Sequence, residues 1–195
     1  MIPNTLGALL AGGRGRRMGG QAKGLIEIDG QPLIRRSYDL LAEVCEAVIV
    51  ITDQAHVYSP HLPDGCPCVP DLRPGFGAPG GVHTALSLAL DRGAASVCVL
   101  ACDLPRITAE DLRGLHDQLG ERAGAFFTAA DHVHPLAGWW RPRLLPSLSA
   151  ALGTGQGLQR LIRQTDAALC PGDPGRLLNL NTPTDLASLR SPPEA

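Results

Sequence analysis

The sequence predicts a three-layer α/β/α fold, Rossmann-like in kind, with a mostly parallel β-sheet. Short apolar runs alternate along the chain with longer stretches whose apolar residues recur at helical spacing. Because strands and helices in turn build strand–helix–strand units, this alternation is typical of a parallel sheet covered by helices. Three unusual segments, residues 10–24, 71–81 and 102–106, fall at predicted strand ends. Ligands of such sheets bind at the carboxyl ends of strands, so we expect one shared site.

The first half of the chain supplies two predicted strands and two predicted helices. Residues 6–10 form a short apolar run that stops at glycines, as buried strands do. Residues 32–44 carry apolar side chains at helical spacing, and Pro32 suits a first helical turn. The branched residues of 47–51 predict a second buried strand. Residues 80–90 predict a helix with one apolar face.

The second half repeats the pattern. Residues 96–101 predict a strand that ends just before Asp103. Thr108 is the expected N-cap of the next helix, because acidic residues follow in its first turn. The remaining predicted elements are a strand over 123–129, helices over 142–152 and 157–163, a strand over 177–180, and a final helix that Thr182 caps with Pro183 in its first turn.

Length and charge exclude several classes of protein. The 195 residues predict a single domain over 1–190, with a Pro-rich frayed tail over 191–195. Because 17 basic and 19 acidic residues leave a net charge of −2, no general attraction to nucleic acid or to an anionic membrane is expected. A phosphate-binding protein of this charge must concentrate its positive charge locally.

The cysteine pattern and the apolar runs indicate a cytoplasmic protein. The six cysteines show neither a zinc-ligand spacing nor a CxxC pair, so we expect reduced and mostly buried thiols. No apolar stretch approaches the roughly 20 residues that cross a bilayer, and no signal peptide is visible at the N-terminus.

The strongest functional signal is the glycine-rich loop over residues 10–24. Its glycines allow the backbone to approach a ligand, and successive backbone N–H groups can then cradle phosphate oxygens. Positive charge is concentrated in the same loop, on Arg14, Arg16, Arg17 and Lys23. An ordinary surface loop with solvated charges is the alternative interpretation. A P-loop is excluded because Gly24 follows Lys23, and a dinucleotide fingerprint is excluded because Met18 stands where its last glycine would be.

In its order of residues, this loop resembles the signature of the molybdenum cofactor guanylyltransferase (MobA) family, approximately LAGGxSxRMGGxDKG. Residues 10–13, 17–20 and 23–24 match it, whereas Gly15 and Ala22 depart from it. Further segments resemble family motifs in the same order along the chain, although Ala78-Pro79 replaces the usual Leu-Ala. These segments are 29–34, Asp71 with 77–81, 102–105, 134–140 and 179–186.

The resemblance implies roles for individual residues. The nucleotide side would comprise Leu10, Ala11, Gly12 and Gly13 at guanine and ribose, Lys23 at the phosphates, and Asp71 and Asp103. Asp103 would hold Mg²⁺ on the GTP phosphates, which agrees with the preference of this ion for carboxylates, phosphates and water. From the residues alone, Asp103 and Asp71 could also be turn carboxylates. Arg17 would serve either the triphosphate or the incoming phosphate.

The acceptor side is assigned with less support from the residues. Asn179 and Asn181 would hydrogen-bond the pterin, although Asn181 could instead belong to the cap of the last helix. His134 would line the acceptor site or be a structural histidine. We expect Trp139 and Trp140 to lie in the core or an interface rather than to stack on a pterin.

The implied reaction transfers GMP from GTP to the phosphate of molybdopterin and releases pyrophosphate. Because the attacking phosphate is already an anion, positioning and charge neutralisation suffice for catalysis. Molybdoenzymes or other cofactor-biosynthesis proteins are possible further partners. Two alternatives stay open: a related transferase that uses CTP or a sugar phosphate, and a non-catalytic protein that binds nucleotide or cofactor.

Overall fold

A computed structural model describes residues 1–12, 22–180 and 185 of the chain. Its main sheet has seven strands in the order β5-β4-β1-β6-β8-β7-β9. The strands are β1 (Ile2–Leu10), β4 (Cys45–Ile51), β5 (Cys68–Val69), β6 (Ser96–Ala101), β7 (Gly124–Ala129), β8 (His132–Trp140) and β9 (Ala168–Pro171). Only β8 runs against its neighbours, so the mostly parallel sheet expected from the sequence is confirmed.

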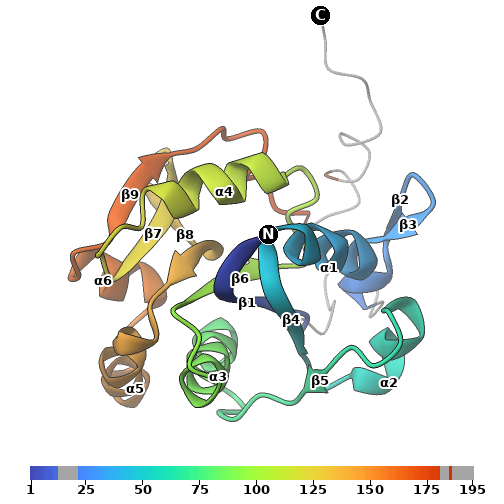
Figure 1. Cartoon of the computed structure of the whole chain (residues 1–195), viewed down its shortest axis with the longest axis horizontal. Coiled ribbons are helices and arrows are strands. Elements are labelled where there is room, and N and C mark those ends of the chain that lie inside the picture. The colour runs from blue at the N-terminus through green and yellow to red at the C-terminus, as the bar shows by residue number, and fades with distance from the viewer. Residues whose placement is uncertain (13–21, 181–184, 186–195) are drawn as a thin grey trace, which may run out of the picture.

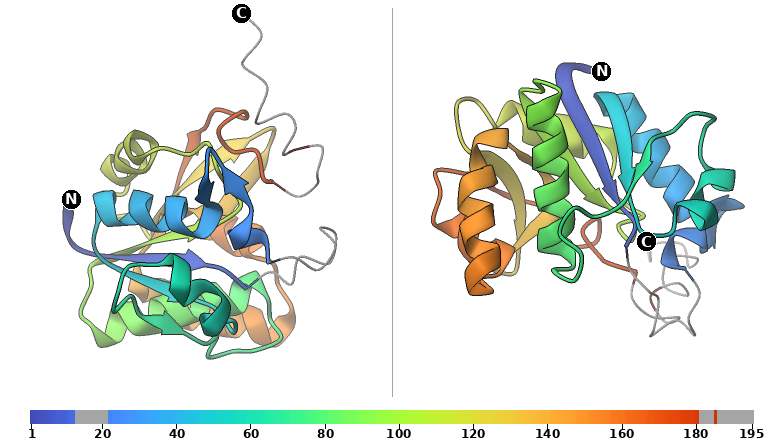
Figure 2. Two further views of the ribbon diagram at one scale, coloured as in Figure 1. Left: turned by 90° about the vertical axis from the view of Figure 1, so that its right-hand side faces the viewer. Right: turned by 90° about the horizontal axis from the view of Figure 1, so that it is seen from below.

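Helices cover both faces of this sheet, which confirms the three-layer arrangement (Figures 1 and 2). One face carries α1 (Leu33–Val44) and α4 (Ala109–Asp117), and the other carries α3 (Ala78–Asp91), α5 (Leu145–Thr154) and α6 (Leu158–Arg163). The short helix α2 (Ala55–Tyr58) and the small hairpin of β2 (Glu27–Ile28) and β3 (Gln31–Pro32) complete the fold beside α1.

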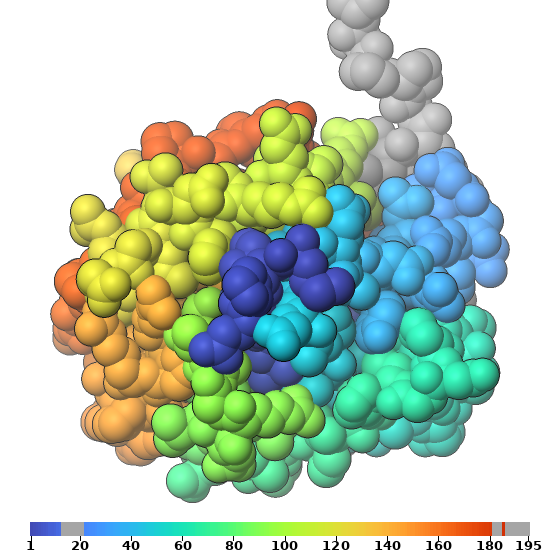
Figure 3. Space-filling model, in the orientation of Figure 1, coloured from blue at the N-terminus to red at the C-terminus, as the bar shows by residue number. Residues whose placement is uncertain are grey.

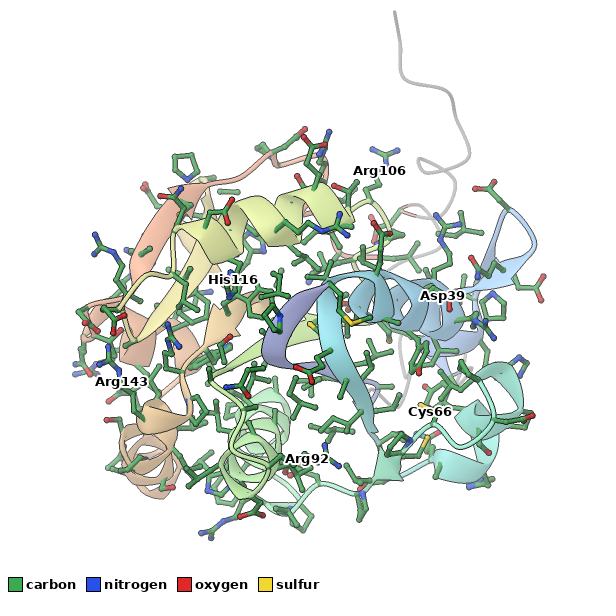
Figure 4. All side chains as sticks on the ribbon, viewed as in Figure 1. Asp39, Cys66, Arg92, Arg106, His116 and Arg143 are labelled. Atoms are coloured by element: carbon green, nitrogen blue, oxygen red, sulfur yellow. The ribbon has the colours of Figure 1, made fainter. Side chains whose placement is uncertain are left out.

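Alternation along β1 divides the core into two layers. Leu9 packs toward α1, whereas Leu6 and Ala8 pack toward α3, because successive side chains of a strand point to opposite faces. Trp139 and Trp140 follow the same rule on β8 and are fully buried on opposite faces. The Trp139 and His116 rings meet edge to face with their centroids 4.6 Å apart. His116, labelled in Figure 4, belongs to α4. The expectation that these tryptophans are core residues is confirmed.

Helix ends follow the chemistry of their sequences. Thr108 caps α4 as expected: its hydroxyl accepts from the Asp111 N–H at 3.2 Å, and the Asp111 carboxylate accepts from the Thr108 N–H at 2.9 Å. Helix α1 begins one residue later than predicted, because Pro32 pairs with Glu27 in the β2–β3 hairpin. Residues 142–144, predicted as the start of α5, form a 3₁₀ turn before it.

One predicted strand is wrong. Residues 177–180 form no ladder with any strand of the described chain, although Leu177 and Leu180 are buried. The Leu177 N–H instead turns back to the Asp173 carbonyl at 3.0 Å, and the Leu180 N–H donates to the Asp103 carbonyl at 2.8 Å. These two backbone hydrogen bonds go to different segments and form no ladder. The apolar side chains of Leu177 and Leu180 therefore reflect packing in the core rather than strand pairing. The predicted final helix from Thr182 and the tail over 191–195 lie outside the described residues.

Strand β8 is the main element that the sequence analysis missed. It runs antiparallel between β6 and β7, and its residues 134–136 pair with neither of them. Pro135 therefore removes no ladder bond, which is why a proline is tolerated inside this strand. Within the described part of the chain, no helix combines the length and the apolar composition needed to cross a membrane.

Candidate functional site

The strand order places a crevice beside β1. From β1 the chain moves outward through β4 to β5 and then returns to β6, on the other side of β1. Such a switch in direction leaves a ligand-binding crevice at the carboxyl ends of the strands. A cavity of about 530 Å³ lies there, and Leu10, Ile51 and Ala101 from the ends of β1, β4 and β6 contribute to its wall. Figure 3 shows the opposite surface, where the N-terminus lies.

Lys23 and Asp103 meet at this cavity. The Lys23 Nζ lies 3.3 Å from the Asp103 Oδ2, and both side chains are 19% exposed. Lys23 begins a 3₁₀ turn over Lys23–Leu25, whereas Asp103 lies two residues after Ala101, the last residue of β6. The Asp103 backbone is held on both sides, since the preceding Cys102 N–H donates to Leu10 at 3.4 Å and the Asp103 carbonyl accepts from Leu180.

The second carboxylate oxygen of Asp103 suits a cation. Asp103 Oδ1 is buried and has no hydrogen-bond partner among the residues that the structure describes. A buried carboxylate oxygen without a partner costs free energy unless a cation or a donor compensates it. In the described ranges no three acidic, histidine or cysteine side chains form a metal cage. A divalent ion at Asp103 would therefore need oxygens from a bound ligand, as Mg²⁺ sites with substrate phosphates do.

Asp71 organises the loop that leads into α3. Its Oδ1 accepts from the Arg73 N–H at 2.8 Å and from the Thr84 hydroxyl at 2.9 Å. Gly80 lies against the same carboxylate, where an added Cβ would come 2.7 Å from Asp71 Oδ2 and 2.6 Å from the Arg73 carbonyl. Asp71 thus holds the loop together and also contributes to the cavity wall.

Helix α3 starts at the cavity. Gly77, at φ +60°, precedes the helix, and Gly77, Ala78 and Gly81 all line the cavity wall. The free N–H groups and the dipole of a helix N-terminus favour negative charge nearby. With the Lys23 ammonium on the other side, the cavity has two features that suit an anion.

The residues predicted to contact guanine and ribose at the end of β1 do not all line the cavity. Leu10 and Gly12 line the cavity. Ala11 lies beneath it, 1% exposed, with its N–H donating to Ile51 at 3.0 Å and its carbonyl accepting from the Thr52 hydroxyl at 3.0 Å. The predicted site residues Gly13 and Arg17 lie outside the described residues, and so does Asn181.

Three polar lining residues were missed by the sequence analysis: Thr52, Asp53 and Tyr58. Thr52 and Asp53 follow β4 as Asp103 follows β6, so their position after a predicted strand was an available signal. Tyr58, at the end of α2, carried no signal in the sequence, because only the folded chain brings α2 to the cavity.

A second cavity of about 290 Å³ adjoins the first. The two share Ala101, Asp103 and Leu136, so Asp103 stands at their boundary. Asn179 and His134, both predicted on the acceptor side, line the second cavity together with Gln159. Burial lowers the pKa of His134, and the nearby His132 acts in the same direction. The structure thus brings predicted nucleotide and acceptor residues to adjacent cavities.

No activated cysteine nucleophile is present at the described part of the cavity. Burial, reinforced by Asp103, raises the pKa of Cys102 to about 12, so its thiol stays protonated near neutral pH. All six cysteines are free thiols. The chemistry that the site can support is therefore charge neutralisation and positioning rather than covalent catalysis by a thiolate.

Comparisons with known proteins agree on one family. A family model described as the MobA-like NTP transferase domain matches residues 7–168. The chain is 35% identical over 190 residues to the molybdenum cofactor guanylyltransferase of Pseudomonas fluorescens, covering 92% of this chain and 90% of that protein. It is also 35% identical to the enzyme of the same name from Rhodobacter capsulatus, with 93% and 92% covered.

A solved structure of similar fold is that of molybdopterin-guanine dinucleotide biosynthesis protein A from Archaeoglobus fulgidus. Its TM-score is 0.75 at 23% identity, and the match covers 94% of this chain and 95% of that one. At this identity the likeness shows the fold alone, which is the mostly parallel sheet with helices on both faces.

Proposed function

The chain belongs to the MobA-like NTP transferase family, and from this premise we propose that it is a molybdenum cofactor guanylyltransferase. It is a nucleotidyltransferase that transfers GMP from GTP to the phosphate of molybdopterin and releases pyrophosphate. The observation that carries the proposal is the meeting of Lys23 and Asp103 at a cavity between strand ends.

GTP occupies the larger cavity in this proposal. Leu10 and Gly12 line this cavity and face guanine and ribose, while Ala11 holds the strand end beside them. Gly13, outside the described residues, is assigned to the same contact on the sequence resemblance alone. Lys23 and the N-terminus of α3 neutralise phosphate charge. Asp71 keeps the 71–81 loop in the shape that lines the nucleotide.

The acceptor phosphate enters from the smaller cavity. Asn179 supplies an amide that can both donate and accept hydrogen bonds with a pterin. Because Asp103 stands at the boundary of both cavities, the acceptor phosphate and the α-phosphate of GTP can approach one another there. Asn181 and Arg17 are assigned to the same acceptor and phosphate region on the sequence resemblance alone.

The reaction forms one bond and breaks one. An oxygen of the molybdopterin phosphate attacks the α-phosphorus of GTP, and the bond from that phosphorus to the bridging oxygen of pyrophosphate breaks. Asp103 is the residue that would hold Mg²⁺, because its buried Oδ1 has no described partner. When bound, this ion neutralises charge on the phosphates. Lys23 keeps the phosphates oriented beside Asp103.

The test is pyrophosphate release by the purified protein with Mg²⁺ and molybdopterin, comparing GTP with CTP, ATP and UTP. Release that selects GTP supports the guanylyltransferase. Selective release with CTP would keep the mechanism but replace the donor nucleotide. An absence of release with every nucleotide, in protein that still binds GTP, would reject the enzyme and leave a binding protein.

A further inference from the structure

Tyr58 is a buried tyrosine in the wall of the larger cavity. It ends α2 and is 1% exposed. The chain has two tyrosines, and the other, Tyr38, is a partly buried residue of α1 outside the lining of this cavity. Helix α2 lies on the same side of the molecule as the β2–β3 hairpin, which follows the 3₁₀ turn over Lys23–Leu25 in the chain (Figures 1 and 2). Tyr58 is thus placed beside the end of the glycine-rich loop.

The Tyr58 ring packs directly on Gly24. A Cβ added at Gly24 would lie 2.7 Å from Cε1 and 3.3 Å from Cζ of the ring. It would also lie 3.2 Å from the Ile34 Cβ on the other side. Real Cβ atoms do not approach neighbours to 2.7 Å, so the missing side chain of Gly24 is what allows the ring to close on the backbone. The turn is held between α2 and α1.

The phenol oxygen adds a polar contact to this packing. Burial raises the pKa of Tyr58 to about 12 while the Gly24 backbone acts in the opposite direction, so the group stays a neutral phenol beside that backbone. Within the turn, the Leu25 N–H donates to Ala22 at 2.9 Å and the Ile26 N–H donates to Lys23 at 3.1 Å. Tyr58 therefore fixes the backbone immediately after Lys23.

We propose that Tyr58 is a positioning residue, which holds the Lys23–Gly24 turn so that the Lys23 ammonium lies beside Asp103 at the phosphate end of the cavity. The inference rests on the proposed function, because it assigns Lys23 to the phosphates of GTP. Tyr58 thus affects the reaction through the position of Lys23. A tyrosine that merely touched the nucleotide, or merely stabilised the fold, would act independently of that lysine.

A double-mutant cycle separates these cases. Tyr58→Phe keeps the ring and removes the hydroxyl, and Lys23→Ala removes the ammonium. We expect Tyr58→Phe alone to lower kcat/KM for GTP by roughly five-fold, because the variant loses the polar influence of the phenol on the Gly24 backbone. In the Lys23→Ala background the same change is expected to alter kcat/KM less than about two-fold, because coupled residues are not additive. Tyr38→Phe is the matched control and keeps wild-type kinetics.

The Kd for GTP of the same four proteins, measured by isothermal titration calorimetry, gives a second readout of the cycle. Equal effects of Tyr58→Phe with and without Lys23 would overturn the inference. If the wild-type protein neither binds GTP nor releases pyrophosphate, the proposed function fails and this inference falls with it. Turnover and binding by the wild type with an additive cycle would reject the role of Tyr58 alone.

Changing the size of the side chains at the Gly24–Tyr58 contact gives an independent check. Gly24→Ala forces the turn away from the Tyr58 ring, and we expect a loss of at least ten-fold in kcat/KM. Shortening the opposing side chain with Tyr58→Leu makes room for the new methyl group, so the double variant is expected to recover activity relative to Gly24→Ala. Wild-type kinetics of Gly24→Ala would contradict a positioning contact at this turn.

Discussion

The Lys23 ammonium lies 3.3 Å from the Asp103 carboxylate, and this pair joins the end of the glycine-rich loop to the end of β6. The two residues are 80 positions apart in the chain. Both side chains are largely buried, and the other oxygen of Asp103 has no partner among the described residues. A cation on each side of one carboxylate would collect the negative charge of a triphosphate at this point.

Removing the charge of Asp103 tests this arrangement. Asp103→Asn keeps the shape of the side chain but removes the charge that would hold Mg²⁺. We expect turnover to fall by at least about 100-fold, the range for losing a group that stabilises transition-state charge. The response of the remaining activity to Mg²⁺ should shift to higher concentrations. Both are measured as pyrophosphate release over a Mg²⁺ titration, with the exposed Asp64→Asn as the control.

Asn179 tests the acceptor cavity separately from the nucleotide cavity. Asn179→Ala removes an amide from the smaller cavity only. We expect KM for molybdopterin to rise about ten-fold, which corresponds to one or two hydrogen bonds, while KM for GTP stays unchanged. Gln118→Ala, which removes an exposed amide at the end of α4, is the control. A rise in the GTP KM instead would move Asn179 to the nucleotide side.

Gly80 tests the loop that Asp71 organises. In Gly80→Ala the new methyl group meets the Asp71 carboxylate and the Arg73 carbonyl, both closer than 3 Å. We expect a loss of about 1–3 kcal/mol in the free energy of unfolding, typical of overpacking, and a higher KM for GTP. Gly114→Ala on α4 is the matched control, because nothing lies within 4 Å of the added methyl group. It should stabilise the protein by about 1 kcal/mol through helix propensity. Urea unfolding measures both.

The parts of the fold that the sequence could predict are those set by local pattern. Residues 48–51 and 96–101 are buried on both faces of the sheet and rich in branched apolar side chains, so their composition identifies these strands. Thr108 caps α4 through a contact three residues away. β8 was missed because His134 and Pro135 interrupt its apolar pattern, at the point where the strand pairs with no neighbour. Residues 177–180 look like a strand because packing, not pairing, makes them apolar.

In the candidate site, the sequence indicates the individual residues but not the contacts between them. Asp103 and Asp71 were predicted as candidates because they occur at strand ends and within recurring motifs, and Lys23 because it closes the glycine-rich loop. Their partners could not be predicted. The Lys23–Asp103 pair, the Thr84 hydroxyl on Asp71 and the ring of Tyr58 on Gly24 all join segments that are distant in sequence. Only the order of strands in the sheet brings them together.

From the burial of His83 we predict how the stability of the fold depends on pH. The ring is buried between α3 and α5, and its Nε2 lies 3.1 Å from the Ser149 hydroxyl. That hydroxyl donates to the Leu145 carbonyl at 2.8 Å, so it accepts from His83, which is consistent with a neutral imidazole. Burial, reinforced by Arg73, lowers the pKa of His83 although Asp71 opposes the shift.

The sign of the effect follows from this lowered pKa. Below about pH 6.5, the ordinary pKa of histidine, the unfolded chain binds a proton that the folded chain resists. The free energy of unfolding should therefore fall as the pH drops from about 7.5 to 5. His83→Gln keeps a donor for Ser149 but cannot titrate, so its loss of stability over this range should be smaller. Urea unfolding at several pH values measures both slopes, and parallel slopes would show that His83 does not carry the dependence.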